Sequence, residues 1–261
     1  MKALAQKILR AFQYFDIGII RYSTLEKLRS NSQAAHDLSL LKELDGVNAQ
    51  QLLKYFRLSK SQLRQDLFVL SSLNFKKHGY FVEFGATNGY DLSNTYLMEK
   101  QFGWSGILAE PATIWHKDLY NHRSCNIETR CVWSDSDRTL TFNQVAVPEL
   151  STINNYSHRD MHAEDRQEGK IYNVKTISLN DLLSKYNAPK HIDYLSIDTE
   201  GSEYEILSNF DFSKHTFQVI TCEHNYTTMR EKIHTLLIQQ DYQRVFENLS
   251  LFDDWFVKRT P

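Results

Sequence analysis

The stretch from Tyr80 to Tyr90 constrains the fold more than any other part of the sequence. It reads Tyr-Phe-Val-Glu-Phe-Gly-Ala-Thr-Asn-Gly-Tyr, so apolar, β-favouring residues lead to an acid and then to a Gly-x-x-x-Gly turn. The pattern predicts a buried strand, a glycine-containing turn and then a helix. Such a turn lets a ligand approach the backbone, and the helix start offers free amide groups. We therefore expect a nucleotide-like cofactor at the carboxyl end of a parallel sheet.

From Gly79 onward, strand-like and helix-like segments alternate, which is typical of an α/β fold with a mainly parallel sheet. The last two strand-like segments are joined by a short polar link and are expected to form an antiparallel pair. Residues 147–172 interrupt the alternation as a long polar stretch, and a loop of that length is usually functional or mobile. The expected strands are 80–84, 105–109, 125–133, 139–142, 192–197, 217–222, 242–246 and 251–257, and the expected helices are 91–102, 112–120, 202–207 and 227–239.

The first part of the chain lacks the strand–helix alternation that begins at Gly79. It predicts a helical extension over residues 1–75, followed by a main domain over residues 76–261. Apolar residues at helical spacing predict a helix over about residues 1–30, and this segment is basic. One interpretation is a helix on an acidic membrane surface or a membrane-bound partner. The other, favoured because the charges are not confined to one face, is an extension packed on the domain or on a second subunit of a homo-oligomer.

The composition limits which binding partners and which cellular location we expect. The net charge of −2 over 261 residues gives no reason to expect a nucleic-acid partner. Three cysteines without Cys-x-x-Cys spacing fit buried thiols in a reducing cytosol. We find no apolar run long enough to span a membrane, and we expect no signal peptide. The expected location is cytoplasmic, with peripheral membrane contact as the alternative that the amino-terminal helix leaves open.

Two carboxylates at neighbouring strand ends favour S-adenosylmethionine as the cofactor. Glu110 ends the second strand, where a carboxylate can accept both ribose hydroxyls of a nucleoside. Glu83 is positioned to accept from the amino group of the cofactor's methionine part, directly or through water. A dinucleotide fingerprint would need Gly-x-Gly-x-x-Gly, but Thr87 stands at its second glycine and the third is missing. Val132 or Trp133, at the third strand end, could form a wall for the adenine ring, although Trp133 could equally be core.

A second group of acids follows the strand at 192–197. Asp198 and Glu200 come directly after it, and Glu223 ends the next strand beside His224. Acids this close repel, so either one has a raised pKa or a cation lies between them. Asp198, Glu223 and His224 are a candidate ligand set for a divalent cation such as Mg²⁺. His224 is the candidate general base because of its ordinary pKa, with Asp198 or Glu200 as alternatives for the base or for orienting a hydroxyl.

Several of these motifs together resemble the FkbM-type methyltransferases. The resemblance rests on Phe81–Gly89, Ser93–Thr95, Gly103–Gly106, Glu110–Pro111, Asp198–Glu203 and Asp254–Val257, and it spans about residues 60–258. It implies a Rossmann-like class I methyltransferase sandwich, a mostly parallel seven-stranded sheet with an antiparallel last strand. It also implies S-adenosylmethionine-dependent O-methylation, often of sugar hydroxyls. The predicted cofactor-binding residues are Glu83, Gly85, Ala86, Asn88, Gly89, Asn94, Glu110, Pro111, Val132, Trp133 and Asp198.

Two other functions use the same features. An NAD- or nucleotide-sugar-dependent oxidoreductase would use the same sheet, but Glu83 and Thr87 disfavour it. A non-catalytic binding or trafficking module would keep the fold without the chemistry, yet the acids at Asp198, Glu200 and Glu223 would have little purpose there. We therefore expect an O-methyltransferase that acts on a small-molecule or glycan acceptor, with the segment 147–172 covering that acceptor.

Overall fold

The computed structural model describes residues 22–157 and 163–259, and the chain divides into two compact units, residues 1–42 and 43–261. In the first unit, helix α2 (Tyr22–Glu43) begins where the description begins. It continues through the polar residues 31–43. Most of the basic helix predicted over residues 1–30 lies outside the described residues. The division falls at residue 42, whereas the sequence suggested a boundary at residue 75.

A seven-stranded sheet forms the centre of the second unit, in the order β10-β11-β9-β8-β1-β2-β3. Strand β1 coincides with the predicted 80–84 strand, and its inner residues are buried, as are nearly all residues of β8. Strands that are buried on both faces read as continuous apolar runs, which is why these two were recognisable. The strands are β1 (Tyr80–Phe84), β2 (Ser105–Ala109), β3 (Asn126–Glu128), β8 (His191–Ile197), β9 (Thr216–Glu223), β10 (Tyr242–Val245) and β11 (Asp253–Lys258).

The seven-stranded sheet is mixed. The pairs β2–β3, β1–β2, β1–β8 and β8–β9 are parallel. Both pairs made by β11, with β9 and with β10, are antiparallel, which confirms the predicted antiparallel pair at the end of the chain. The four-residue helix α10 (Glu247–Ser250) occupies the link between β10 and β11.

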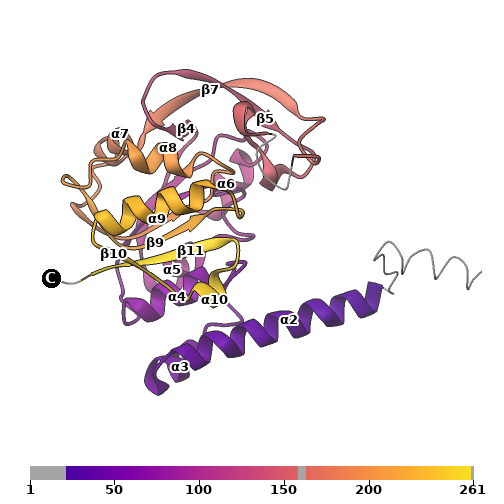
Figure 1. Cartoon of the computed structure of the whole chain (residues 1–261), viewed down its shortest axis with the longest axis vertical. Helices are drawn as coiled ribbons and strands as arrows, with labels where there is room; N and C mark the ends of the chain where they lie inside the picture. Colours follow the sequence, from indigo (N-terminus) through magenta and orange to yellow (C-terminus); the bar gives the residue numbers. More distant parts are fainter. Residues whose placement is uncertain (1–21, 158–162, 260–261) are drawn as a thin grey trace, which may run out of the picture. The chain divides into compact units, whose positions relative to one another are not determined.

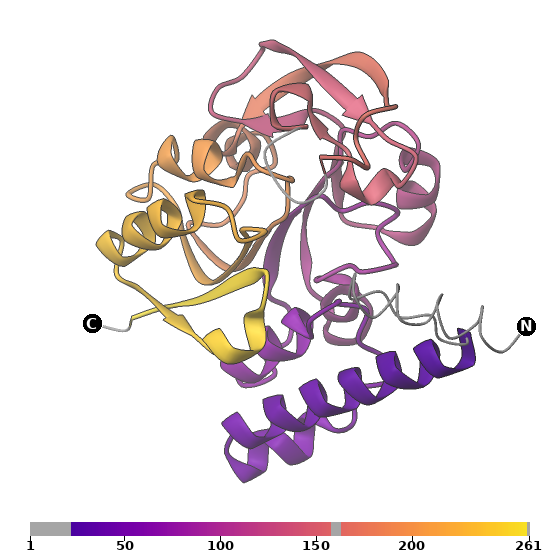
Figure 2. The same cartoon turned by 45° about the vertical axis from the view of Figure 1, so that its right-hand side comes forward.

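Helices cover both faces of this sheet. Helices α7 (Leu179–Lys185), α8 (Glu203–Ser208) and α9 (Met229–Gln239) share one hydrophobic core with β1, β2, β8 and β9. Helix α6 (His116–His122) lies on the opposite side of the strands (Figure 2). Helix α5 (Tyr96–Phe102) is shorter than the predicted 91–102, because residues 91–95 form a loop. Helices α3 (Gly46–Leu52) and α4 (Gln65–Ser72) precede β1.

A second sheet, which the sequence did not predict, has the order β4-β7-β5-β6. Its strands are β4 (Cys131–Trp133), β5 (Thr139–Gln144), β6 (Thr152–Ile153) and β7 (Lys170–Ser178), and β5 and β7 are labelled in Figure 1. The prediction of one strand over 125–133 was wrong: β3 and β4 belong to different sheets. Glu128 accepts hydrogen bonds from the backbone and guanidinium of Arg130, which fixes the break between them.

The stretch 147–172 is not one loop. It contains the 3₁₀ helices η1 (Pro148–Leu150) and η2 (Asn154–Tyr156), strand β6 and the start of β7. Ile153 and Tyr156 pack in a small core with Ala112, Phe142 and Val174, so this segment is part of the folded unit. None of the helices that the structure describes is both long and apolar enough to cross a membrane.

Candidate functional site

A cavity of about 420 Å³ lies at the carboxyl ends of β1, β2, β8 and β9. The second sheet contributes Val132, Phe142 and Ile153 to its wall, and the predicted covering segment contributes residues 148–151. No lysine, arginine or histidine is among the described lining residues. The acidic lining residues are Glu83, Glu110, Glu149, Asp198, Glu200, Glu223 and Asp253. The ends of the parallel strands bring together Glu83, Glu110, Asp198, Glu200 and Glu223, as the sequence predicted for this edge. Glu149 comes from η1 and Asp253 from the antiparallel strand β11.

Packing inside the protein requires a glycine at both Gly85 and Gly89. Gly85 has φ +70°, and a Cβ added to it would lie 2.0 Å from the backbone oxygen of Asp198. Gly89 has φ +74°, and a Cβ there would lie 2.6 Å from side-chain atoms of Arg123 and Leu119. Only glycine adopts such backbone angles without strain. The missing side chain of Gly85 therefore lets the end of β1 approach the end of β8, in addition to any room it leaves for a ligand.

Glu83 holds the loop that follows the turn. Its buried carboxylate accepts hydrogen bonds from the backbone amide of Asn94 at 2.7 Å and from the hydroxyls of Ser93 and Thr95. The wholly buried side chain of Arg123 lies 3.7 Å from it. Most of the hydrogen-bonding capacity of Glu83 is thus used inside the protein. Its predicted contact with a cofactor amine stays a prediction.

Glu110 lies at the end of β2 with capacity left on both carboxylate oxygens. Oε2 accepts the amide of Thr87 at 2.8 Å, and Oε1 accepts the amide of Ala112 at 2.7 Å. Burial raises the pKa of Glu110 to about 7, against the lowering effect of these two amides. Because a carboxylate can accept about four hydrogen bonds, each oxygen retains a lone pair for a ligand in the cavity.

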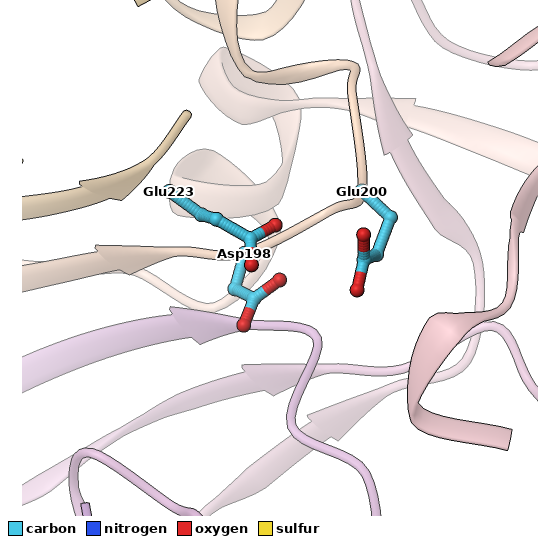
Figure 3. A group of neighbouring side chains, drawn as sticks. All are labelled: Asp198, Glu200 and Glu223. Carbon is cyan, nitrogen blue, oxygen red and sulfur yellow. The ribbon is translucent and has the colours of Figure 1, made fainter. Parts of the chain in front are cut away.

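Asp198, Glu200 and Glu223 come together at the ends of β8 and β9. One oxygen of each lies within 4.8 Å of the others, and Figure 3 shows the three carboxylates beyond the strand ends. Burial raises the pKa of Asp198 to about 6, while a hydrogen bond from Glu223 opposes that rise. Burial, followed by the charge of Asp198, raises the pKa of Glu223 well above its usual range. Glu223 is therefore the protonated member and donates to the Asp198 carboxylate.

Glu200 is held by an arginine that the sequence did not reveal. Arg166, whose side chain is completely buried, donates to Glu200 Oε2 at 2.7 Å, and Asn225 donates to the same oxygen at 3.2 Å. The hydroxyl of Thr152 donates to the backbone oxygen of Glu200 at 2.9 Å. The positive φ of 58° at Glu200 is rare for a residue with a side chain. These contacts fix both the turn and the carboxylate.

The family description "Methyltransferase FkbM domain" matches residues 83–255, more than half of the chain. The chain belongs to the FkbM methyltransferase family. The matched region starts at Glu83 and ends at Trp255, so it contains the glycine turn, Glu110 and the three clustered acids. The resemblance predicted from the motifs is thereby confirmed, over a shorter range than the expected 60–258.

Comparison with other proteins adds little beyond the family. No curated protein matches the sequence significantly. Among solved structures, the precorrin-6y C5,15-methyltransferase from Geobacter metallireducens GS-15 is similar at 9% sequence identity and a TM-score of 0.41. The similarity covers 74% of this chain and 85% of that one. A likeness this distant carries no functional argument.

The predicted site residues of the FkbM domain fall into two groups. Those that line the cavity are Glu83, Gly85, Asn94, Glu110, Pro111, Val132, Asp198, Glu200 and Glu223. Those outside its lining are Ala86, Asn88, Gly89, Trp133 and His224. Asn88 caps the turn instead, because its Oδ1 accepts the amides of Tyr90 and Asp91 at 2.9 Å. Trp133 packs with its ring centroid 6.0 Å from that of Tyr156.

His224 is buried away from the clustered acids. Its Nδ1 accepts the backbone amide of Tyr226 at 3.0 Å, so the proton resides on Nε2, which faces Asp254 at 3.7 Å. Burial lowers the pKa of His224, with Asp254 opposing that shift. The metal set predicted from Asp198, Glu223 and His224 is not assembled, because the acid grouped with Asp198 and Glu223 is Glu200. Nothing in this geometry supports His224 as the general base.

Asp253, at the start of β11, also lines the cavity and was not predicted. Its Oδ2 accepts from Gln65 Nε2 at 3.1 Å and from Trp255 Nε1 at 3.3 Å, whereas its Oδ1 has no hydrogen-bond partner among the described residues. The Oδ1 of Asn94 is likewise without a partner in the described part of the chain, while its Nδ2 donates to Ser196. Buried acceptors of this kind are usually satisfied, so both point to a ligand.

Proposed function

We propose that this FkbM methyltransferase uses S-adenosylmethionine to methylate a hydroxyl of a sugar or glycan. The observation that carries the proposal is the meeting of Glu110, Asn94 and Asp198 in one cavity at the strand ends. The seven-stranded sheet, with β11 antiparallel to both neighbours, supports the finer assignment to the Rossmann-like class I arrangement. In such α/β sheets ligands bind at the carboxyl ends of the strands.

The residues present suit the cofactor. The free lone pairs of Glu110 can accept the hydroxyls of a ribose, and Val132 and Pro111 offer apolar surface beside it. The unpartnered Oδ1 of Asn94 is an acceptor for an ammonium group. When bound, the cofactor supplies a methyl group made electrophilic by its sulfonium.

The hydrogen-bonded pair of Asp198 and Glu223 is the best candidate for the general base. Methyl transfer to a hydroxyl needs an acceptor for the hydroxyl proton, and a base is most effective when its pKa lies near the working pH. Asp198, with a pKa of about 6, is deprotonated at neutral pH, and the proton on Glu223 keeps two negative charges from facing each other. Glu200 is bound by Arg166 and Asn225, so its role is to orient a hydroxyl.

A divalent cation at the three clustered acids is the remaining part of the sequence prediction. Glu200 already interacts with Arg166, and Glu223 hydrogen-bonds Asp198, so little negative charge is left to attract a metal. We therefore expect methyl transfer to continue at an unchanged rate after dialysis against EDTA. A rate that falls in EDTA and returns on adding Mg²⁺ or Mn²⁺ would contradict this.

The test of the proposed function has two steps. Calorimetric titration with S-adenosylmethionine and S-adenosylhomocysteine tests the cofactor, and transfer of a labelled methyl group to a glycan mixture tests the reaction. Binding of NAD with no binding of either sulfur compound would exclude the proposal. Binding without transfer to any acceptor would instead favour a non-catalytic module.

A further inference from the structure

One acid that neither the cofactor nor the base needs, Asp253, lies opposite Glu223 of the base pair on a neighbouring strand. Glu223 on β9 and Asp253 on β11 are directly opposite each other in the antiparallel register. Residues in this relation point to the same face of a sheet, where two ionised carboxyls would repel, and Glu223 keeps its proton there. Burial raises the pKa of both carboxyls well above their usual range. The structure shows no ion pair between either acid and any described basic residue.

One member of this pair has an open position. Asp253 is only 4% exposed, and its Oδ1 accepts no hydrogen bond from the described residues, although the residue lines the cavity. The other oxygen is held by Gln65 and Trp255, which fixes the orientation of the carboxyl group. A buried carboxylate oxygen without a donor is costly, so this position is suited to a ligand that brings a donor or a positive charge.

Aromatic residues line the same part of the cavity. Tyr226 and Phe252 are both in its wall, and Tyr226 remains 60% exposed despite its size. The loop holds Asn225 and Tyr226 at φ angles of 43° and 56°, which are unfavourable for residues with side chains. Two amide hydrogen bonds to the oxygen of Phe252, from His224 and Asn225, maintain this conformation. Aromatic rings beside carboxylates are the usual surroundings of a bound ammonium group.

We propose that the acceptor presents a protonated amine to the open oxygen of Asp253, which is ionised when the amine binds, as an amino sugar with a free amino group would. The inference rests on the proposed function, because it assigns Glu110, Asn94 and Asp198 to the cofactor and the base. Around Asp253 the cavity is lined by acids and by no described basic residue, which disfavours phosphates and carboxylates on the acceptor. The expected methyl acceptor is therefore a cationic saccharide, and a neutral saccharide should bind more weakly. Saccharides with an anionic group beside the methylated hydroxyl should not bind.

The test compares three tetrasaccharides that differ in charge: a chitosan tetramer with free amines, a chitin tetramer with acetamides and a galacturonate tetramer with carboxylates. Binding to the full chain saturated with S-adenosylhomocysteine is measured by saturation-transfer NMR, at a pH where the amine is protonated. We expect the chitosan tetramer to bind at least about tenfold more tightly than the chitin tetramer, with no binding of the galacturonate tetramer. Equal or tighter binding of the chitin tetramer, any binding of the galacturonate tetramer, or binding of none of the three would overturn the inference.

Variants separate this inference from the proposed function. Asp253→Asn keeps the size of the side chain but removes its charge, and it should reduce the chitosan preference to within about twofold without changing the affinity for S-adenosylhomocysteine. Asp241→Asn makes the same chemical change at an exposed residue that pairs only weakly with Lys258 at 3.9 Å, and it should change neither. An unchanged preference in Asp253→Asn would refute the ammonium site, whereas a wild-type protein that fails to bind S-adenosylhomocysteine would refute the proposed function itself.

Discussion

Replacing Gly85 by alanine tests why the opening turn needs a glycine. The added Cβ would lie 2.0 Å from the backbone oxygen of Asp198, a contact that requires the ends of β1 and β8 to separate. The φ of +70° adds about 1–2 kcal/mol of strain for a residue with a side chain. Forcing extra atoms into a packed site costs about 1–3 kcal/mol more. Together these predict a loss of about 2–5 kcal/mol in the free energy of unfolding, measured by urea denaturation without any cofactor.

The matched control is Gly46→Ala at the start of α3, where an added Cβ would meet nothing within 4 Å. We expect its free energy of unfolding to stay within about 0.5 kcal/mol of the wild-type value. If Gly85→Ala were as stable as the control and only lost affinity for S-adenosylmethionine, the glycine would serve ligand approach alone. The packing argument would then be refuted.

Three further predictions follow from the site. Arg166→Met leaves the buried Glu200 without its charged partner and should lower the free energy of unfolding by about 3–5 kcal/mol. Adding Glu200→Gln should restore part of this loss in urea titrations. Equal losses in the single and double variants would show that the pair is not coupled. Burial raises the pKa of Glu110 from 4.5 to about 7, so the folded state binds this proton more tightly than the unfolded state does. The stabilisation that results is lost as the pH rises from about 4.5 through 7. Across that pH window the free energy of unfolding of Glu110→Gln should therefore change by up to about 3 kcal/mol less than that of the wild type. An identical pH dependence in the two proteins would refute the raised pKa of Glu110. The rate of methyl transfer should rise with pH around the pKa of about 6 of Asp198. Asp198→Asn should lower that rate by about 10²–10⁴-fold. His224→Gln should leave the midpoint of the rate's pH dependence unchanged. A shifted midpoint in His224→Gln would instead identify the histidine as the general base.

The central sheet was predictable because its strands carry local signals. The apolar run of β1, the acids at strand ends and the antiparallel terminal pair are all visible within short windows of sequence. Parallel strands then bring their carboxyl ends to one edge, so Glu110, Asp198 and Glu223 could be expected in one place without any knowledge of tertiary contacts.

The second sheet and the partners of the acids were not predictable in the same way. Strand β7 begins inside a polar stretch, where its alternation is easily taken for a loop. Arg166 and Glu200 are 34 positions apart, and Gln65 and Asp253 are 188 apart, so no local pattern joins them. The position of His224 beside Glu223 in the sequence suggested a shared site, but His224 follows the end of β9 and lies outside the lining of the cavity. Its side chain faces Asp254 and holds the loop of Tyr226.

The most direct test of the account is calorimetric titration of the wild-type chain and of Glu110→Ala with S-adenosylhomocysteine, at a pH of about 8, where the Glu110 carboxyl is ionised. We expect one binding site in the wild-type protein and at least about tenfold weaker binding in the variant, because hydrogen bonds to a charged group are worth about 1.5–3 kcal/mol each. Absence of binding to the wild-type protein, or equal affinities for the two proteins, would contradict the central claim that this cavity holds S-adenosylmethionine through the carboxylate at the end of β2.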